Sequence, residues 1–294
     1  MRTLTVFLCL LLAGLLAAMP ARAQEEKKLS FNEDLDPDDR LVIDNYKGSI
    51  TVTTWNRDEV AVDVRIVADE TDHLVEDTDV KVHRSGSTLH FETDYDEDAW
   101  KRLRKRGLLD MFNGFSQPFV HYEVRMPRAA RLVIDDYKSE IRVTGLRSDL
   151  IIDTYKGGID VEDLDGSLRL ETYKGTGYVT FSRFQDDSSV ETYKGRVTLD
   201  LPADTGFDLD ADLGRRGDLD SEFDLDRRRR TDDDDDDGFW DDDDDDDGDD
   251  DDDDEYWDDD DDDDDNRYRG AVNGGGPRLH LDSYKGRISL RRVR

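Results

Sequence analysis

The segment Leu150-Ile-Ile-Asp-Thr-Tyr-Lys-Gly-Gly-Ile-Asp-Val161 is one of six copies of a motif with an acid-x-Tyr-Lys core. Apolar residues lie five and three positions before the tyrosine and four and six positions after it, except at Gly177 and Ser188. Apolar spacing of two on both sides of a glycine-containing corner predicts a strand, a turn and a second strand. The glycine stands where a tight turn favours positive φ, although Ser139 replaces it in one copy.

The spacing of the copies predicts how these strands are arranged. The motif tyrosines are Tyr46, Tyr137, Tyr155, Tyr173, Tyr193 and Tyr284, so the three central steps are 18, 18 and 20 residues. Such a step suits one coil of a β-solenoid, in which each repeat buries its apolar face against its neighbours. A meander of hairpins is the alternative. We expect an all-β chain, a single-chain parallel β-helix or β-solenoid with coils of 18–20 residues, and we expect the two outlying copies to join it.

The first 23 residues predict a secretory signal peptide. Arg2 precedes an apolar run from Leu4 to Ala18, and the small residues Ala21 and Ala23 suit cleavage before position 24. A retained membrane anchor is the alternative. The only cysteine of the chain lies inside this segment, so the processed chain would hold no disulfide and no thiolate metal site. We therefore expect an exported protein of the periplasm or cell surface.

The rest of the chain divides by composition and repeats. We expect an N-terminal β region at 24–131, solenoid coils at 132–226, a disordered poly-Asp insert at 227–269 and a closing coil at 270–294. Within the first region, residues 100–115 predict one short amphipathic helix, because five lysines and arginines at 101–106 alternate with apolar residues. This helix could cap the solenoid, contact a membrane surface peripherally or dock the acidic insert.

The charge of the chain is concentrated in one place. The formal net charge is −35, but 27 Asp and one Glu lie between Asp232 and Asp265, and the remainder holds 48 acidic against 41 basic side chains. Nucleic-acid binding has little support, because phosphate contact needs a clustered basic surface. An insert of this charge density cannot bury a core, which predicts disorder.

The insert also offers carboxylates to Ca²⁺, a hard cation that takes oxygen ligands. Its candidate ligands are Asp233, Asp235, Asp237, Asp241 and Asp244. A calcium-loop spacing is weak support, because any run of aspartates matches it. Binding would be of low affinity and high capacity, and no other cofactor is expected.

Stacked coils would align the motif side chains in rows about 4.8 Å apart. The candidate ligand-binding residues are Tyr46, Lys47, Tyr137, Lys138, Tyr155, Lys156, Tyr173, Lys174, Tyr193, Lys194, Tyr284 and Lys285. Neighbouring lysines would repel by about 0.9 kcal/mol in water, which an interleaved row of motif carboxylates could offset. The rows are then a structural ladder. Alternatively they form a binding strip, in which aromatic faces stack on sugar rings and ammonium groups hold an anionic polymer.

Motifs of catalysis are missing from the sequence. The five histidines have no metal-ligand spacing, and there is no nucleophile elbow, phosphate loop or His-Glu-x-x-His motif. A polysaccharide-active β-helix enzyme is the best enzymatic alternative, but it needs one asymmetric cluster, whereas this repeat is uniform. We expect a non-enzymatic scaffold or surface-binding protein whose partner is an envelope polysaccharide or a surface protein.

The chain resembles the bacterial putative-adhesin group of domains of unknown function, relatives of auto-transporter head domains. The resemblance rests on the short Gly-x-Ile-x-Val coils and on four segments, Leu41–Trp55 followed by Asp58–Val62, Val124–Pro127, Leu199–Pro202 and Gly274–Pro277. It implies an exported β-helical domain with a packed interior and no established enzymatic chemistry, and some relatives are linked to envelope stress responses. The uniform Tyr-Lys pair and the poly-Asp insert depart from the family.

Overall fold

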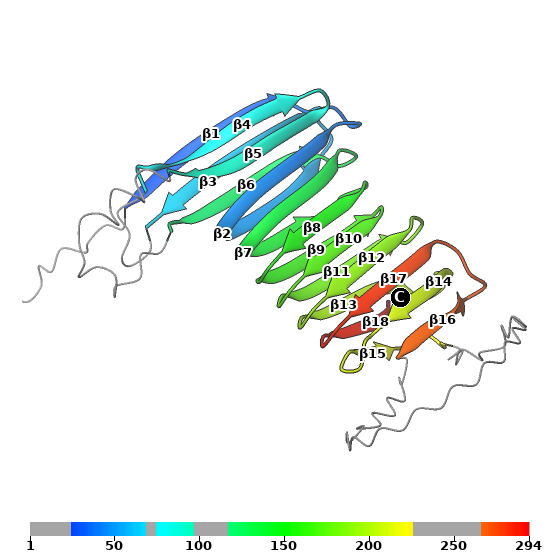
Figure 1. Ribbon diagram of the computed structural model, residues 1–294. Coiled ribbons are helices and arrows are strands. Elements are labelled where there is room, and N and C mark those ends of the chain that lie inside the picture. The colour runs from blue at the N-terminus through cyan, green and yellow to red at the C-terminus, as the bar shows by residue number, and fades with distance from the viewer. Residues whose placement is uncertain (1–24, 69–74, 97–116, 226–265, 294) are drawn as a thin grey trace, which may run out of the picture.

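The computed structural model describes residues 25–68, 75–96, 117–225 and 266–293. These residues form eighteen strands and no helix, which confirms the expected all-β class for this part of the chain (Figure 1). The predicted signal peptide at 1–23, the predicted helix at 100–115 and the poly-Asp run lie outside the described residues.

Most of the strands are short, and β2 and β7 are the longest in the described part of the chain. Their bounds are β1 Glu26–Asp34, β2 Arg40–Trp55, β3 Glu59–Val67, β4 Thr78–Ser85, β5 Thr88–Tyr95, β6 Phe119–Pro127, β7 Arg131–Thr144, β8 Leu150–Thr154, β9 Gly158–Asp165, β10 Leu168–Thr172, β11 Thr176–Arg183, β12 Ser188–Thr192, β13 Arg196–Pro202, β14 Phe207–Asp212, β15 Asp218–Ser221, β16 Arg267–Val272, β17 Arg278–Ser283 and β18 Arg287–Val293.

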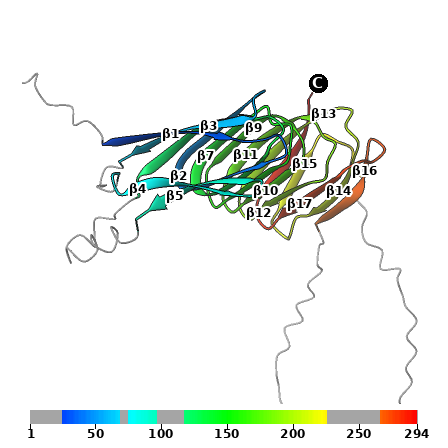
Figure 2. The same ribbon diagram turned by 90° about the horizontal axis from the view of Figure 1, so that it is seen from above.

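Hydrogen bonding arranges the strands in two walls of one curled sheet. The first wall runs β4, β5, β2, β7, β8, β10, β12, β17, β14, β16. The second wall runs β1, β3, β6, β2, β7, β9, β11, β13, β18, β15. The long strands β2 and β7 belong to both walls, because each passes through the motif corner without a break. Figure 2 shows the two layers curling around the interior.

Successive motif copies pair in parallel and in register. Ile152 pairs with Ile134 on one side and with Leu170 on the other, and Val190 pairs with Leu281. The outlying copies therefore join the same stack as the central ones, as expected. The residues between them loop out and return, so that β17 lies against β12 although 91 residues separate the paired positions.

The expectation of a wholly parallel sheet is wrong at both ends of the stack. The pairs β1–β3, β3–β6, β4–β5 and β14–β16 are antiparallel, so the sheet is mixed. The reason is visible at Gly86, which has φ of +58° in the two-residue connection between β4 and β5. A connection this short closes a hairpin, whereas a parallel neighbour needs a long crossover.

The expected end of the acidic insert at residue 269 is also wrong. Residues 267–269 begin strand β16, which pairs with β14. Arg267 contacts Asp212 at 3.0 Å and Arg269 contacts Asp210 at 2.9 Å. Opposite charges that face each other across two antiparallel strands stabilise the pairing of those strands, so these arginines belong to the sheet.

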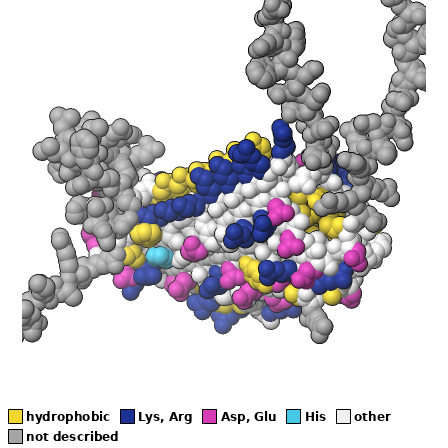
Figure 3. All heavy atoms as spheres, turned by 90° about the horizontal axis from the view of Figure 1, so that it is seen from below, with side chains coloured by type: hydrophobic (Ala, Val, Ile, Leu, Met, Phe, Trp, Pro, Cys, Tyr) yellow, Lys and Arg dark blue, Asp and Glu magenta, His cyan; other side chains and the backbone are white. Residues whose placement is uncertain are grey.

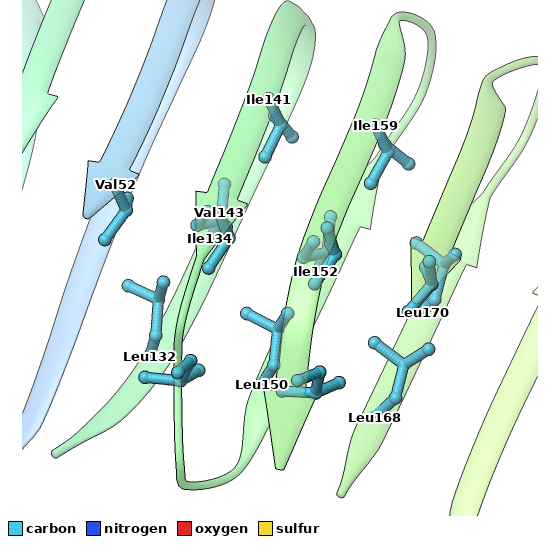
Figure 4. Packing of buried hydrophobic residues seen from close by; sticks show 14 of the residues in the cluster. Val52, Leu132, Ile134, Ile141, Val143, Leu150, Ile152, Ile159, Leu168 and Leu170 are labelled. Atoms are coloured by element: carbon cyan, nitrogen blue, oxygen red, sulfur yellow. The ribbon is translucent and has the colours of Figure 1, made fainter. Parts of the chain in front are cut away.

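The core lies between the walls, where the apolar side of each strand points. Figure 4 shows Ile134, Ile152 and Leu170 from one wall meeting Ile141 and Ile159 from the other. All five side chains are buried. Burying one such side chain contributes roughly 1.5–3 kcal/mol, so the alternating pattern stabilises each coil through its neighbours. The corner that carries the motif is thus held on a rigid scaffold.

Candidate functional site

The motif corner is closed from inside by the residue that precedes the tyrosine. This residue is buried in every copy, and the set is Asn45, Asp136, Thr154, Thr172, Thr192 and Ser283. The Thr172 hydroxyl accepts a hydrogen bond from the backbone N–H of Gly175 at 2.9 Å, and the next two copies repeat this bond at 2.8 and 2.9 Å. Short polar side chains close turns in this way. Sequence reasoning missed this row, although all six residues are Asn, Asp, Ser or Thr.

The corner glycines are required mainly by close approach between coils. Only Gly48 and Gly157 have positive φ, at +143° and +155°. A Cβ atom on Gly195 would lie 2.6 Å from the carbonyl oxygen of Gly175 and would also collide with the Thr192 hydroxyl. The predicted need for positive φ is therefore wrong for the later copies, where glycine lets one corner lie directly against the next.

The six motif tyrosines form one continuous stack along the corner. Neighbouring ring centroids are 4.6–4.9 Å apart and the rings are within 4–10° of parallel. At the N-terminal end, the edge of Tyr95 contacts Tyr46 at 6.1 Å. Each inner ring is covered on both faces by its neighbours, so it presents its edge and hydroxyl group outward. The expected stacking of sugar rings on aromatic faces is therefore blocked along the inner part of the row.

Five of the motif lysines line the outside of this stack. The ammonium groups of Lys174, Lys194 and Lys285 lie 5.2, 5.3 and 4.9 Å from the ring centroid of the preceding tyrosine. We call Lys138, Lys156, Lys174, Lys194 and Lys285 the lysine row. Figure 3 shows a band of basic side chains running beside a band of hydrophobic ones along the molecule.

Lys47 does not belong to the exposed row. Its side chain is buried, with 6 % of its surface exposed. Its Nζ donates a hydrogen bond to the carbonyl oxygen of Gln117 at 3.0 Å and lies 3.8 Å from the ring centroid of Phe119. Strand β6 covers this corner, because Val120 pairs with Gly48 and the strand continues along β2.

The motif carboxylates do not interleave with the lysine row. In the described part of the chain, no carboxylate oxygen lies within 4.0 Å of the Nζ atom of any of the five lysines. Glu171 instead contacts Arg169, and the carboxylates act on one another. Burial raises the pKa of Asp153, and the neighbouring charges of Glu171 and Asp135 raise it further. The expected charge-balanced ladder is thus not formed.

A hollow of about 410 Å³ borders the C-terminal half of the lysine row. Its cationic lining residues are Lys174, Lys194, Arg196, Arg216, Lys285 and Arg287, and Asp218 supplies its one carboxylate. That carboxylate contacts Arg287 at 2.8 Å. Since five further cations line the hollow, it favours an anionic ligand.

A chain of buried hydrogen bonds lies behind the first three corners. The Thr93 hydroxyl donates to Asn45, whose amide donates to the Ser139 hydroxyl at 3.0 Å. Ser139 in turn donates to Asp136 through both its N–H and its hydroxyl, and Thr154 donates to the same carboxylate at 3.1 Å. Burial raises the pKa of Asp136 to about 6 despite these three donors.

Among the described residues, no group of three or more His, Cys, Asp or Glu side chains is placed to hold a metal ion. The five candidate Ca²⁺ ligands lie outside this part of the chain. The described residues also contain no helix that is long and apolar enough to cross a membrane.

Comparisons with known proteins give likenesses of overall shape. No family model matches the chain, and no curated protein matches it in sequence. A putative cell adhesion protein from Clostridium sporogenes is 11 % identical with a TM-score of 0.44, over 91 % of this chain and 100 % of that one. A putative adhesin from Bacteroides fragilis is 12 % identical with a TM-score of 0.31, over 91 % and 97 % of the two chains. A putative adhesin from Parabacteroides merdae is 9 % identical with a TM-score of 0.20, over 93 % and 98 %.

All three bacterial proteins carry adhesin or cell-adhesion names, as does the group that the sequence resembles. Their TM-scores are below 0.5 and their identities below 25 %, so they assign neither a family nor a ligand. The functional argument therefore rests on the tyrosine stack and the lysine row.

Proposed function

We propose that this protein is an exported, non-enzymatic β-solenoid of the bacterial periplasm or cell surface, and that its lysine row binds an anionic polysaccharide of the envelope. The in-register parallel pairing of successive coils supports the solenoid description. The observation that carries the binding role is the alignment of five lysines without a carboxylate partner among the described residues. The role is adhesin-like, since it holds a surface polymer without changing it.

The energetics of the row favour a ligand. Lysines on adjacent coils repel by about 0.9 kcal/mol per pair at a spacing of about 4.8 Å in water. Cation–π contacts with the tyrosine rings stabilise the lysines by roughly 0.5–1 kcal/mol each at exposed sites, which only offsets the repulsion. A linear polyanion would remove the repulsion along the whole row. Several weak contacts on one chain then add to a useful affinity.

The geometry of the row selects a linear polymer over a compact anion. The cations stand in one line along an uninterrupted stack of rings, and the tyrosines of this stack are partly exposed beside them. Hydroxyl groups and ammonium groups together suit a polysaccharide that carries both hydroxyls and carboxylates. The repeat of one cation per coil offers equivalent contacts to successive units of such a chain.

The test compares two triple variants that lose the same charge. In the strip variant, Lys156, Lys174 and Lys194 become Gln. In the control variant, Arg131, Arg142 and Arg183 become Gln; these arginines are ion-paired with aspartates elsewhere on the walls. Polygalacturonate is titrated against each protein, with neutral dextran as the polymer control.

We expect the strip variant to lose at least about tenfold in affinity, roughly 1.4 kcal/mol, with a melting temperature within a few degrees of the wild type. The control variant should bind within about threefold of the wild type. Equal losses in the two variants, or equal binding of dextran, would contradict the proposal. Collapse of the strip variant would instead support the structural ladder.

A further inference from the structure

A seventh coil follows the last motif copy, and its corner has no tyrosine. Strand β14 pairs in parallel with β17 through Asp212 and Asp282, and β15 pairs with β18 through Asp218 and Arg287. The corner between β14 and β15 reads Leu213-Gly-Arg-Arg-Gly217. The sequence offers Phe207–Leu213 as an alternating strand, but the missing Tyr-Lys pair hides the coil from a search for the motif.

Gly214 occupies the place in this coil that a seventh tyrosine would take. Counted from β14, Leu213 follows Asp212 as Ser283 follows Asp282, so Gly214 corresponds to Tyr284. The corner then holds one residue more than the last motif corner before it reaches β15, where Asp218 pairs with Arg287. A Cβ atom on Gly214 would lie 3.5 Å from the Tyr284 carbonyl oxygen and 3.6 Å from its Cα, which are ordinary contacts. The stack of rings therefore ends one ring short because glycine has no side chain.

The two ends of the tyrosine stack consequently differ. Tyr95 contacts Tyr46 at the N-terminal end, whereas Tyr284 is 50 % exposed, more than any other large hydrophobic side chain in the described part of the chain. A hollow of about 570 Å³ lies against Tyr284 and is lined also by Arg215, Arg216 and Lys285. This volume falls within the range of about 300–1,000 Å³ that is usual for small-molecule sites.

The hollow at Tyr284 continues into the basic hollow beside the lysine row. Arg216 and Lys285 line both. Among the described residues that line the two hollows, seven side chains are cationic and one is a carboxylate, in a chain whose net charge is −35. A local excess of positive charge in so acidic a protein selects an anion, and its continuity with the row selects the end of a polymer.

We propose that this hollow, the end site, binds a terminal sugar acid of the anionic polysaccharide, with the sugar ring packed on Tyr284 in the place of a seventh tyrosine. The aromatic face is electron-rich and attracts the C–H groups of a pyranose ring. The guanidinium group of Arg216 suits a sugar carboxylate, which it can bind with two parallel hydrogen bonds. The following sugars then lead toward Lys194 and Lys174. The inference rests on the proposed function.

The test uses trigalacturonate, which is too short to span the row, and maltotriose as its neutral counterpart. Both are titrated by calorimetry into the full chain and into single variants. We expect Tyr284→Ser and Arg216→Gln each to lower the affinity for trigalacturonate about tenfold. The control Tyr178→Ser removes an exposed tyrosine that lies outside the stack and should bind within about twofold of the wild type. Melting temperatures establish that each variant is folded.

A second variant, Gly214→Asn, leaves the stack and the cations in place. Its φ of +46° is one that asparagine tolerates, and the new side chain would occupy part of the end site. We expect about fivefold weaker trigalacturonate binding. Unchanged affinity in Tyr284→Ser and Arg216→Gln, or equal binding of maltotriose, would overturn the end site. If polygalacturonate still depended on Lys156, Lys174 and Lys194, the lysine row would stand alone.

Discussion

Asp136 makes the stability of the protein depend on pH in a direction opposite to that of most carboxylates. It stands at the corner position that other copies fill with Thr, Ser or Asn, and only 5 % of its surface is exposed. Burial raises its pKa from 3.8 to about 6. The folded state therefore holds the proton more tightly than the unfolded state does. Stability is greatest below pH 3.8 and falls as pH rises through the window from 3.8 to 6.

The magnitude follows from the width of that window. With a pKa of 3.8 in the unfolded chain and about 6 in the folded protein, Asp136 contributes about 3 kcal/mol less to the free energy of unfolding above pH 6 than below pH 4. Asp136→Asn removes this contribution, because the amide is neutral at both pH values. Its oxygen can accept from the backbone N–H of Ser139, and asparagine already stands at this position in the first copy, as Asn45.

Urea denaturation at pH 4 and pH 7 measures the effect. We expect Asp136→Asn to be more stable than the wild type at pH 7, with a difference between the two proteins that changes by about 3 kcal/mol across the range. The control Asp135→Asn removes one exposed charge on the same strand and should keep most of the wild-type pH dependence, since burial is the largest cause of the shift. A difference profile that is flat from pH 4 to 7 would refute the reasoning.

Three further predictions concern the corner and the insert. Gly195→Ala should destabilise the protein by about 2–4 kcal/mol in urea, because its Cβ meets the Gly175 carbonyl, whereas Gly177→Ala should change stability by less than about 1 kcal/mol; similar losses would refute the close-approach argument. Deleting residues 232–265 changes the net charge from −35 to −7 and should raise polygalacturonate affinity at low salt, with no gain at 1 M salt. Calorimetry should detect Ca²⁺ binding to the full chain and none to the deletion variant; equal heats would refute the calcium proposal.

Most of the fold could be predicted from the repeat, because apolar side chains at every second position indicate which face of a strand is buried. The apolar pattern that includes Ile152 and Ile159 predicted two strands whose apolar sides face the same core. The steps of 18–20 residues predicted that neighbouring copies pair, as they do in the structure. The antiparallel ends were not predictable in this way, since β1, β3 and β4 lack the motif and pair through hairpins and long-range register. Local pattern does not specify which distant strand becomes a neighbour.

The sequence predicted that the motif side chains form rows, but not which members of each row are exposed. The sequence places Lys47 and Lys156 at equivalent motif positions, yet β6 buries the first and leaves the second exposed. The sequence also cannot show that the motif rings stack on one another, or that Tyr284, at the end of the described stack, lines a hollow. The end site lies at a coil that lacks the motif tyrosine and has Gly214 in its corner instead. A search for the motif finds the copies that carry it and passes over this coil.

Lys47 also shows what a lysine with a structural role looks like in this corner. Its ammonium group has a backbone carbonyl partner and an aromatic ring at 3.8 Å, and the sheet covers it. Lys156, Lys174 and Lys194 are exposed. In the coils of Lys174 and Lys194 the corner is closed by a buried threonine hydroxyl, and the motif rings stack across all three coils. Closure of the corner therefore does not require the charge of these lysines. A charge without a carboxylate partner among the described residues, repeated in five of the six motif copies, is the observation that supports the proposed binding along the row.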